Sequence, residues 1–154
     1  MNVASVWLIW IPIFLVFSGF WDLFEIGKGP MMASHSNART VCEHLRNMTN
    51  DMIRAMADRG GVMRMNFAPG FVYLTNATVQ GVMDHIDYIM DLVGPDHVGL
   101  GSDFDGIPYT PEGLEGVTKM PNITAELVRR EYSEEDVRKV LGENHLRSFK
   151  DVLG

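Results

Sequence analysis

The segment Ser34-His35-Ser36 places an imidazole ring between two small side chains. The serines leave room for the ring of His35 to approach a metal ion or a substrate, and a neutral imidazole nitrogen is a good zinc ligand. From spacing alone, a lone loop histidine more often bonds to nearby backbone. The sequence contains no HExxH motif and no paired CxxC motifs. His35 is therefore a candidate metal ligand that needs partners from elsewhere.

Two carboxylates stand close together further along the chain. Asp103 and Asp105 flank Phe104 and lie between Gly101 and Gly106. The glycines let the backbone turn sharply, which can direct one carboxylate toward a reacting proton. The alternative is a loop in which the aspartates only form turns. The pattern indicates a candidate acid or base without deciding which aspartate serves.

Two kinds of cofactor are disfavoured by the same region. A calcium loop that begins at Asp103 needs glycine at its sixth position and glutamate at its twelfth, where Pro108 and Leu114 stand. The segment Gly99-x-Gly101 lacks the third glycine of a dinucleotide-binding loop. The sequence therefore supports neither a calcium loop nor a nicotinamide cofactor.

Arg46 is a candidate for binding a carboxylate. Its planar guanidinium can form two parallel hydrogen bonds to such a group, although a surface arginine is the commoner fate. The other histidines show no ligand spacing with one another, and they are His44, His85, His97 and His145. We expect His85 to be solvated, because it lies on the polar flank of an amphipathic helix.

Alternating strands and helices position these residues. Short apolar runs predict strands over 31–33, 62–66 and 97–101. Helices are predicted over 20–26, 50–59, 79–93 and 123–131. Two further helices are predicted after these: the first is capped by Ser133, and the second carries apolar residues at 146, 149, 152 and 153. This order predicts βαβ units with a parallel sheet.

Polar side chains stand at the ends of all three predicted strands. His35 follows the first strand, Asn66 closes the second and Asp103 follows the third. In parallel α/β folds the carboxyl ends of the strands meet at one edge, where the chemistry is placed. We therefore expect these three residues to lie together. About three strands are predicted, whereas a closed (β/α)8 barrel needs eight.

Composition bounds the class of protein. The 154 residues carry 20 acidic and 13 basic side chains, a formal charge of −7, and the basic residues are scattered. Nucleic acid is therefore not an expected partner. The hydrophobic content of 46% is sufficient for one core without disulfides. Cys42 is the only cysteine and cannot form an internal disulfide.

The first 21 residues contain no charged side chain, a length that can cross a bilayer core of about 30 Å. Three alternatives are open: a span or signal anchor, a cleaved signal peptide, and a misjoined coding segment. Three Asn-x-Thr sequons, at Asn47, Asn76 and Asn122, weakly favour a secretory route. We divide the chain into an apolar segment, 1–19, and a domain, 20–154, and expect a membrane or secretory location.

Four stretches of the sequence resemble one family in their order and spacing. They are SHSNAR (34–39), EHLRN (43–47), GLGSDFDG (99–106) and TPEGLEGVTKMPN (110–122). The chain from about residue 20 to 154 resembles the renal or membrane dipeptidases, a family of zinc metallopeptidases. The resemblance implies an α/β fold that is the C-terminal portion of a (β/α)8 TIM-like barrel, a binuclear zinc centre, and hydrolysis of dipeptides, often with a D-residue at the C-terminal side.

The resemblance also implies roles for three residues. His35 matches a histidine ligand of the zinc pair, and Arg46 matches the arginine that binds the C-terminal carboxylate of the substrate. Asp103 matches the active-site aspartate beside the scissile bond, where it contacts substrate and transfers a proton. Two zinc ions would activate a bridging water and polarise the carbonyl group.

The chain departs from the family pattern upstream of His35. The His-x-Asp motif, the bridging glutamate and the other zinc-ligand histidine of the family have no counterpart before Ser34. Because a catalytic zinc ion needs about three protein ligands, we expect the chain alone to be inactive and truncated, by a faulty gene model or a real deletion. The alternatives are a non-catalytic, membrane-anchored remnant that binds a partner, and an unrelated binding module.

Since three parallel strands leave apolar surface uncovered, we also expect aggregation or association, for example as a homo-oligomer.

Overall fold

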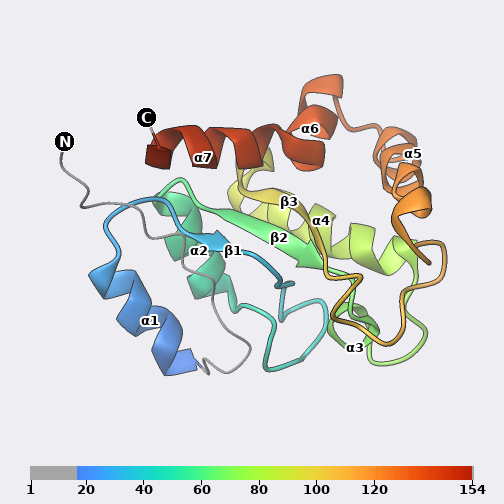
Figure 1. Ribbon diagram of the computed structural model, residues 1–154, viewed down its shortest axis with the longest axis horizontal. Helices are drawn as coiled ribbons and strands as arrows, with labels where there is room; N and C mark the ends of the chain where they lie inside the picture. The colour runs from blue at the N-terminus through green and yellow to red at the C-terminus, as the bar shows by residue number, and fades with distance from the viewer. Residues whose placement is uncertain (1–16, 154) are drawn as a thin grey trace.

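The computed structural model describes residues 17–153, which have an α/β architecture (Figure 1). Three parallel strands form one sheet in the order β1 (Met32–Ala33), β2 (Val62–Asn66) and β3 (Val98–Ser102). The register shifts between Met65 and Asn66, so that Asn66 pairs with Ser102 at the carboxyl end of the sheet. The predicted parallel sheet is confirmed, and β3 begins and ends one residue later than expected.

Helices connect the strands and continue after the last one. The α-helices of the described residues are α1 (Phe17–Ile26), α2 (Asn50–Asp58), α3 (Pro69–Val72), α4 (Val79–Val93), α5 (Pro121–Arg129), α6 (Glu134–Arg138) and α7 (Asn144–Leu153). Shorter turns of helix are η1 (Pro95–His97), η2 (Val117–Lys119) and the π-helical η3 (Lys139–Glu143). The side chains of Thr49, Thr78 and Ser133 cap α2, α4 and α6. These caps begin the helices where the sequence predicts them, because each hydroxyl satisfies a backbone N–H of the first turn.

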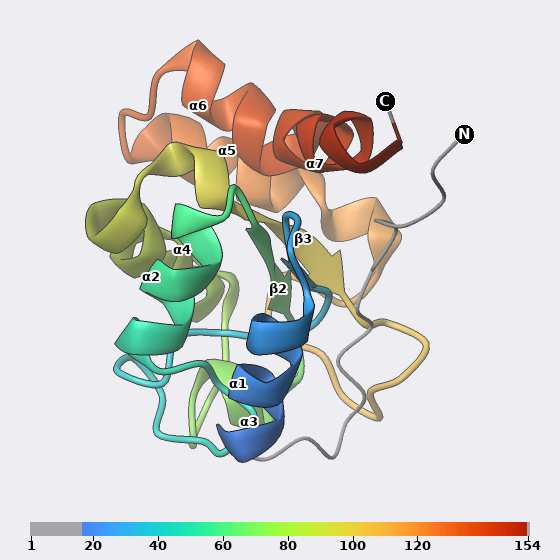
Figure 2. The same ribbon diagram turned by 90° about the vertical axis from the view of Figure 1, so that its left-hand side faces the viewer.

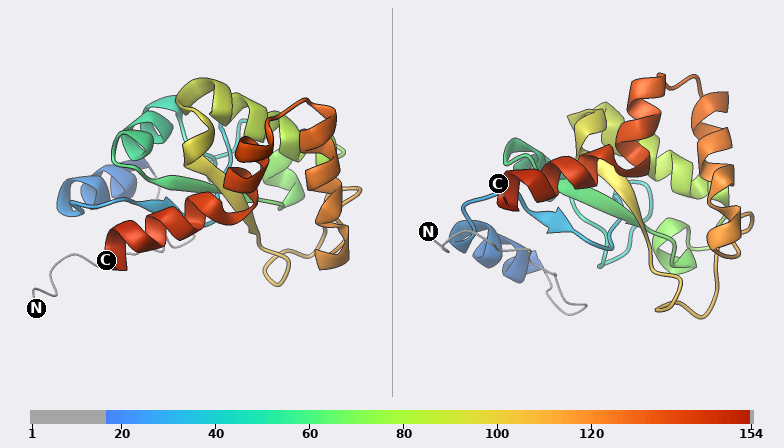
Figure 3. Two further views of the ribbon diagram at one scale, coloured as in Figure 1. Left: turned by 90° about the horizontal axis from the view of Figure 1, so that it is seen from above. Right: turned by 45° about the horizontal axis from the view of Figure 1, so that its top comes forward.

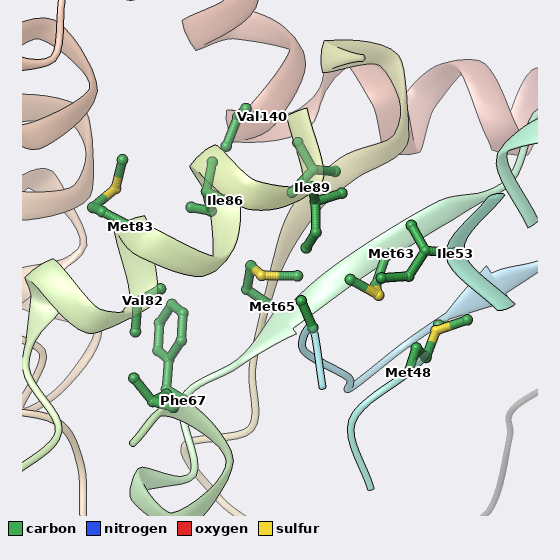
Figure 4. Packing of buried hydrophobic residues seen from close by; sticks show 14 of the residues in the cluster. Met48, Ile53, Met63, Met65, Phe67, Val82, Met83, Ile86, Ile89 and Val140 are labelled. Atoms are coloured by element: carbon green, nitrogen blue, oxygen red, sulfur yellow. The ribbon is translucent and has the colours of Figure 1, made fainter. Parts of the chain in front are cut away.

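The helices α2 and α4 cover one face of the sheet (Figure 2). Met63 and Met65 of β2 belong to a fully buried cluster with Ile53 of α2 and with Ile86 and Ile89 of α4 (Figure 4). Flexible methionine side chains fill the irregular space between a twisted sheet and its helices. Burying each such side chain stabilises the fold by about 1.5–3 kcal/mol, so this layer holds the strand ends at fixed positions.

The opposite face of the sheet carries a close contact with α7. Gly99 pairs with Arg64, which lies between the core residues Met63 and Met65 on β2, so both face away from α4. The imidazole of His145 lies against Gly99, where a Cβ atom would stand 2.4 Å from the ring carbon Cε1. Figure 3 shows α7 and α4 on opposite sides of β2. Glycine at position 99 therefore permits α7 to approach the sheet.

The last helix turns a polar side toward the protein. Asn144 and Ser148 are buried, whereas Leu146 is 60% exposed and Leu153 is 71% exposed. The side-chain amide of Asn144 donates hydrogen bonds to the carbonyl oxygens of Pro95 (2.7 Å) and Val98 (2.8 Å). Polar contacts rather than an apolar stripe thus attach α7 to the amino-terminal end of β3.

Arg59, the residue that follows α2, contacts the end of α1. The guanidinium of Arg59 lies 3.4 Å from the ring centroid of Phe24 and donates to the carbonyl oxygens of Phe24 and Gly27.

Within residues 17–153, none of the helices has the length and apolar character needed to cross a bilayer. The predicted apolar segment lies outside the described residues except for 17–19, which belong to α1.

The sheet ends at β1 on one side and at β3 on the other. Within the described part of the chain, neither strand has a second neighbour, and three strands are present where a closed barrel has eight. The α/β class with parallel strands is confirmed. The (β/α)8 barrel stays a prediction, because it needs strands in addition to these three.

Candidate active site

His35, Asn66 and Asp103 meet at the carboxyl edge of the sheet, as predicted from the strand ends. Nε2 of His35 lies 3.9 Å from Oδ1 of Asp103. The side-chain amide of Asn66 donates a hydrogen bond of 3.0 Å to the other carboxylate oxygen, Oδ2. Three neighbouring strands therefore contribute one polar group each to a single site.

The backbone after β3 selects Asp103 rather than Asp105 for this site. Ser102 and Asp103 have positive φ angles of 53° and 75°, which cost about 1–2 kcal/mol each for residues other than glycine. The turn is held by a hydrogen bond of 2.8 Å from the Asp103 N–H to the Gly101 carbonyl oxygen. Asp105 is exposed. The two aspartates therefore point to different places, and only the first one faces His35.

Gly106 leaves the space that the Asp103 carboxylate occupies. A Cβ atom at position 106 would stand 2.4 Å from Oδ1 of Asp103. The glycine N–H also donates a hydrogen bond of 2.9 Å to the Asp103 carbonyl oxygen. The spacing of Asp103 and Gly106 in the sequence is thus part of the geometry of the site.

Asn37 joins the loop after His35 to the end of β2. Its side-chain amide donates a hydrogen bond of 3.0 Å to the carbonyl oxygen of Asn66, and its Oδ1 accepts one of 2.9 Å from the Asn66 N–H. Both asparagines are buried. The side chain of Asn37 thereby continues the pairing of β1 with β2 beyond the point where β1 ends.

The imidazole of His35 is partly buried beside two cations. Its Nδ1 lies 3.0 Å from Oγ of Ser34. Burial lowers the pKa of His35, the carboxylate of Asp103 opposes that change, and the nearby guanidinium groups of Arg64 and Arg46 lower the pKa further. These influences favour the neutral ring, which is the form that can bind a metal ion.

Arg46 is placed beside the site by an aromatic side chain. Its guanidinium carbon lies 5.3 Å from the ring centroid of Phe71, which also contacts the ring of His44, with 4.4 Å between the two ring centroids. The main-chain N–H of Arg46 donates a hydrogen bond of 3.1 Å to Nδ1 of His44. Within residues 17–153, no carboxylate forms an ion pair with Arg46. Its charge is therefore available to an acidic ligand.

The sequence model of the membrane dipeptidases, peptidase family M19, matches residues 17–153. The chain belongs to this family. It is 39% identical over 133 residues to an uncharacterized dipeptidase of Schizosaccharomyces pombe, a match that covers 84% of this chain and 32% of that protein. The chain spans about a third of the length of this curated relative.

The fold is also similar to those of solved structures. A metallo peptidase from Rhodobacter sphaeroides, liganded with a phosphinate mimic of the dipeptide L-Ala-D-Ala, superimposes with a TM-score of 0.82 and 32% identity. The match covers 87% of this chain and 39% of that one. An amidohydrolase from Pseudomonas aeruginosa superimposes with a TM-score of 0.81 and 26% identity, covering 89% of this chain and 50% of that one. The fold of the described residues is thus one that the membrane dipeptidase family shares.

The metal that the family implies can be compared with the side chains present. Within residues 17–153, no group of three histidine, cysteine, aspartate or glutamate side chains lies close enough to hold a metal ion. His35 and Asp103 provide two donor atoms, 3.9 Å apart. Since a catalytic zinc ion takes about three protein ligands, the described residues fit one part of such a site and do not complete it.

His85 is not solvated, and the prediction for this residue is wrong. The ring is fully buried, its Nδ1 accepts a hydrogen bond of 3.1 Å from the Ala38 N–H, and its Nε2 lies 2.9 Å from the carbonyl oxygen of Val72. Burial lowers the pKa of His85, although the bond to Val72 raises it in part. The flank of α4 that is polar in sequence thus faces α3 and the loop after His35.

Sequence reasoning did not single out Asn37, His44 and Phe71 as residues that support the site. Asn37 and His44 lie within two of the stretches that carry the family resemblance, SHSNAR and EHLRN, which could have drawn attention to them.

Asn47, one of the three sequon asparagines, is buried and donates from Nδ2 to the carbonyl oxygens of Cys42 and Phe71, both at 2.8 Å. Carbohydrate cannot be attached to this amide in the folded chain. Asn76 is exposed. The argument for a secretory route from three sequons is therefore weakened.

Proposed function

We propose that this chain supplies one side of the active site of a zinc-dependent dipeptidase and forms the C-terminal portion of a (β/α)8 barrel. The observation that carries the proposal is the approach of His35 Nε2 to Asp103 Oδ1, at 3.9 Å, on the carboxyl edge of a parallel sheet in a member of the membrane dipeptidase family. Catalytic groups of barrel enzymes lie on that edge.

In this proposal His35 is one ligand of a binuclear zinc centre. The remaining ligands come from residues outside 17–153, because no group of three possible metal-binding side chains lies together within the described residues. The roles proposed below are therefore restricted to what the side chains of this chain do themselves.

Asp103 acts on protons in the proposed reaction. Its carboxylate accepts a proton from the attacking water as the new C–O bond forms, and it delivers that proton to the amine nitrogen as the C–N bond of the dipeptide breaks. The hydrogen bond from Asn66 to Oδ2 leaves Oδ1 directed toward His35 and the reacting groups. The products are two amino acids.

Arg46 recognises the C-terminal carboxylate of the substrate. The guanidinium lies against Phe71 and has no acidic partner within the described residues, so a bidentate bond to a carboxylate is open to it. The Rhodobacter sphaeroides relative is liganded with a mimic of L-Ala-D-Ala. We therefore propose dipeptides with a free carboxylate as substrates, including those with a D-residue at the C-terminal side.

A non-catalytic binding module is the second candidate. It is favoured by the two-donor metal site and by the exposed apolar side of α7, formed by Leu146, Phe149 and Leu153. In that case the chain would bind a protein partner or a second copy of itself, and residues 1–21 would attach it to a membrane of the secretory pathway. The two candidates differ in whether dipeptides are turned over.

The test uses the longest natural polypeptide that contains this chain, purified and loaded with zinc. We expect it to hydrolyse L-Ala-L-Ala and L-Ala-D-Ala but not their C-terminal amides. In the variant Arg46→Met, KM for the dipeptides should rise by about 10- to 100-fold, the usual loss when one partner of a bidentate pair is removed. As a control, Arg54→Met changes an exposed arginine on α2 and should leave KM unchanged.

Two results separate the candidates. Zinc-dependent turnover with the Arg46 effect supports the dipeptidase. No turnover of any dipeptide by the zinc-loaded polypeptide, or equal hydrolysis of dipeptides and their amides, contradicts it. Residues 17–153 expressed alone should show no turnover, because His35 is their one proposed zinc ligand and no group of three possible ligands lies among them.

A further inference from the structure

Asn66 touches both halves of the candidate site. It is fully buried at the end of β2, between the loop that carries His35 and the turn that carries Asp103. Its backbone N–H and carbonyl both pair with the side chain of Asn37, two residues after His35. Its own side chain bonds to Asp103. One residue thus links the two candidate catalytic groups.

The orientation of the Asn66 amide is fixed by the backbone around it. Oδ1 accepts a hydrogen bond of 2.6 Å from the N–H of Ala68. An N–H can bond only to the oxygen of the amide, so the NH2 group must face Asp103 and donate to it. Rotating the amide by half a turn would break both bonds in a buried place, where unpaired polar groups are costly.

Asp103 stands on a turn with an unusual backbone conformation, and Asn66 holds one of its carboxylate oxygens. With φ at 75°, directly after Ser102 at 53°, the turn has an unfavourable conformation for two successive residues. The hydrogen bond of 3.0 Å from Asn66 holds Oδ2, and Oδ1 then points at His35. Without this bond the carboxylate can rotate about its own side-chain torsions.

We propose that Asn66 is a positioning residue for the dipeptidase reaction: its amide orients the Asp103 carboxylate, and its backbone holds the His35 loop through Asn37. This proposal rests on the function proposed above. Asn66 does not contact the substrate. It sets the separation of two groups that come from β1 and β3, which pair with β2 and not with each other.

The variant Asn66→Asp removes the NH2 donor, keeps an oxygen for the Ala68 N–H, and places a second carboxylate against Asp103. The control is Asn144→Asp, which alters another buried asparagine whose amide donates two hydrogen bonds, at the opposite end of β3. Both variants lose a buried amide donor, so both lose stability. Only the first should affect the site.

Kinetics on the zinc-loaded natural polypeptide give the first readout. We expect Asn66→Asp to lower kcat by about 10- to 100-fold while KM stays within a few-fold, because a misplaced group acts on the transition state rather than on substrate binding. Asn144→Asp should keep kcat. A rise in KM with kcat unchanged, or equal losses of kcat in both variants, would overturn the proposal.

Crystal structures of the same proteins give a second readout that needs no activity. In Asn66→Asp, Oδ1 of Asp103 should move away from His35 Nε2 by about 1 Å or more, and in Asn144→Asp it should not move. An unmoved Asp103 in the first variant overturns the positioning role, even if no dipeptide is hydrolysed. Absence of turnover in the wild type with a displaced Asp103 in the variant instead contradicts the proposed function and leaves the positioning of Asp103 supported.

If Asn66→Asp does not fold, Asn66→Ser replaces it. The serine removes the amide donor without adding a charge. The same displacement of Asp103 and the same loss of kcat are expected, and a wild-type position of Asp103 with wild-type kcat would again overturn the proposal.

Discussion

The main-chain N–H of Ala38 donates a hydrogen bond of 3.1 Å to Nδ1 of His85, which joins the loop after His35 to the middle of α4. The other ring nitrogen of His85 lies 2.9 Å from the carbonyl oxygen of Val72. One buried imidazole therefore bonds a donor in one segment and an acceptor in another. The loop that carries His35 is attached to the helical layer through this ring.

The variant His85→Ala should destabilise the protein by about 2–4 kcal/mol. It leaves the Ala38 N–H and the Val72 carbonyl without partners and opens a cavity in a fully buried place. Urea unfolding followed by circular dichroism measures the change. Asp91→Ala, an exposed position on α4, should change the free energy of unfolding by less than about 0.5 kcal/mol. Equal effects of the two variants would show that the bridge has no stabilising role.

Acid should weaken the fold from about pH 6.5 downward, because burial favours the neutral form of two histidines in the folded chain. Burial lowers the pKa of His85 below its usual 6.5, and burial with the nearby Arg64 lowers the pKa of His145 to about 4. Between pH 6.5 and about 4 the unfolded chain therefore binds more protons than the folded one, so the free energy of unfolding falls as pH falls through that range. Urea titrations at several pH values test this. In the variant His145→Gln the dependence on pH should be weaker, and an unchanged slope would contradict the prediction.

Removing the charge of Arg64 should raise the pKa of His145. The guanidinium lies on the same face of the sheet as Gly99, against which the imidazole packs, and its charge lowers the pKa of that ring. In Arg64→Met the pKa of His145 should move upward from about 4, as followed by the ring proton signals in an NMR titration. Arg54→Met, on the exposed side of α2, serves as the control and should leave the pKa in place. A pKa of His145 that is equal in all three proteins would rule out the charge of Arg64 as a cause.

The contact between β3 and α7 should be sensitive to one methyl group. In Gly99→Ala the new Cβ atom would stand 2.4 Å from Cε1 of His145, so the ring or the helix that carries it must shift, at a cost of about 1–3 kcal/mol. At Gly116 no atom lies within 4 Å of an added Cβ, so Gly116→Ala should be nearly neutral. Thermal unfolding of both variants distinguishes them. A Tm for Gly99→Ala equal to that of Gly116→Ala would contradict the close packing of the His145 ring against Gly99.

The helices and strands that the sequence predicts well are those with regular local patterns. The apolar residues of 79–93 recur at helical spacing between the Thr78 cap and Gly94, and the helix forms over those residues. The strand ends predicted the meeting of His35, Asn66 and Asp103, because the carboxyl ends of parallel strands share one edge of a sheet. Local pattern and topology were sufficient for these features.

Features that depend on tertiary contacts could not be predicted in the same way. His85 lies on the polar side of α4 in sequence, but α3 and the loop after His35 cover that side. The short helix α3 spans four residues, too few for a periodic pattern that would predict it. The choice between Asp103 and Asp105 depends on positive φ angles that composition does not specify. In α7 the buried side is polar, because Asn144 bonds to backbone carbonyls, so hydrophobic periodicity gives the wrong side.

The most direct measurement is the rate of L-Ala-D-Ala hydrolysis by the zinc-loaded natural polypeptide in two single variants, Asp103→Asn and Asp105→Asn. Both remove one carboxylate from the same turn, but only Asp103 faces His35, at 3.9 Å, while Asp105 is exposed. We predict that Asp103→Asn lowers kcat by about 10²- to 10⁴-fold, the usual contribution of a general acid or base, and that Asp105→Asn keeps kcat within a few-fold. Wild-type kcat in Asp103→Asn, or equal losses in both variants, would contradict the assignment of Asp103 as the proton-transferring group.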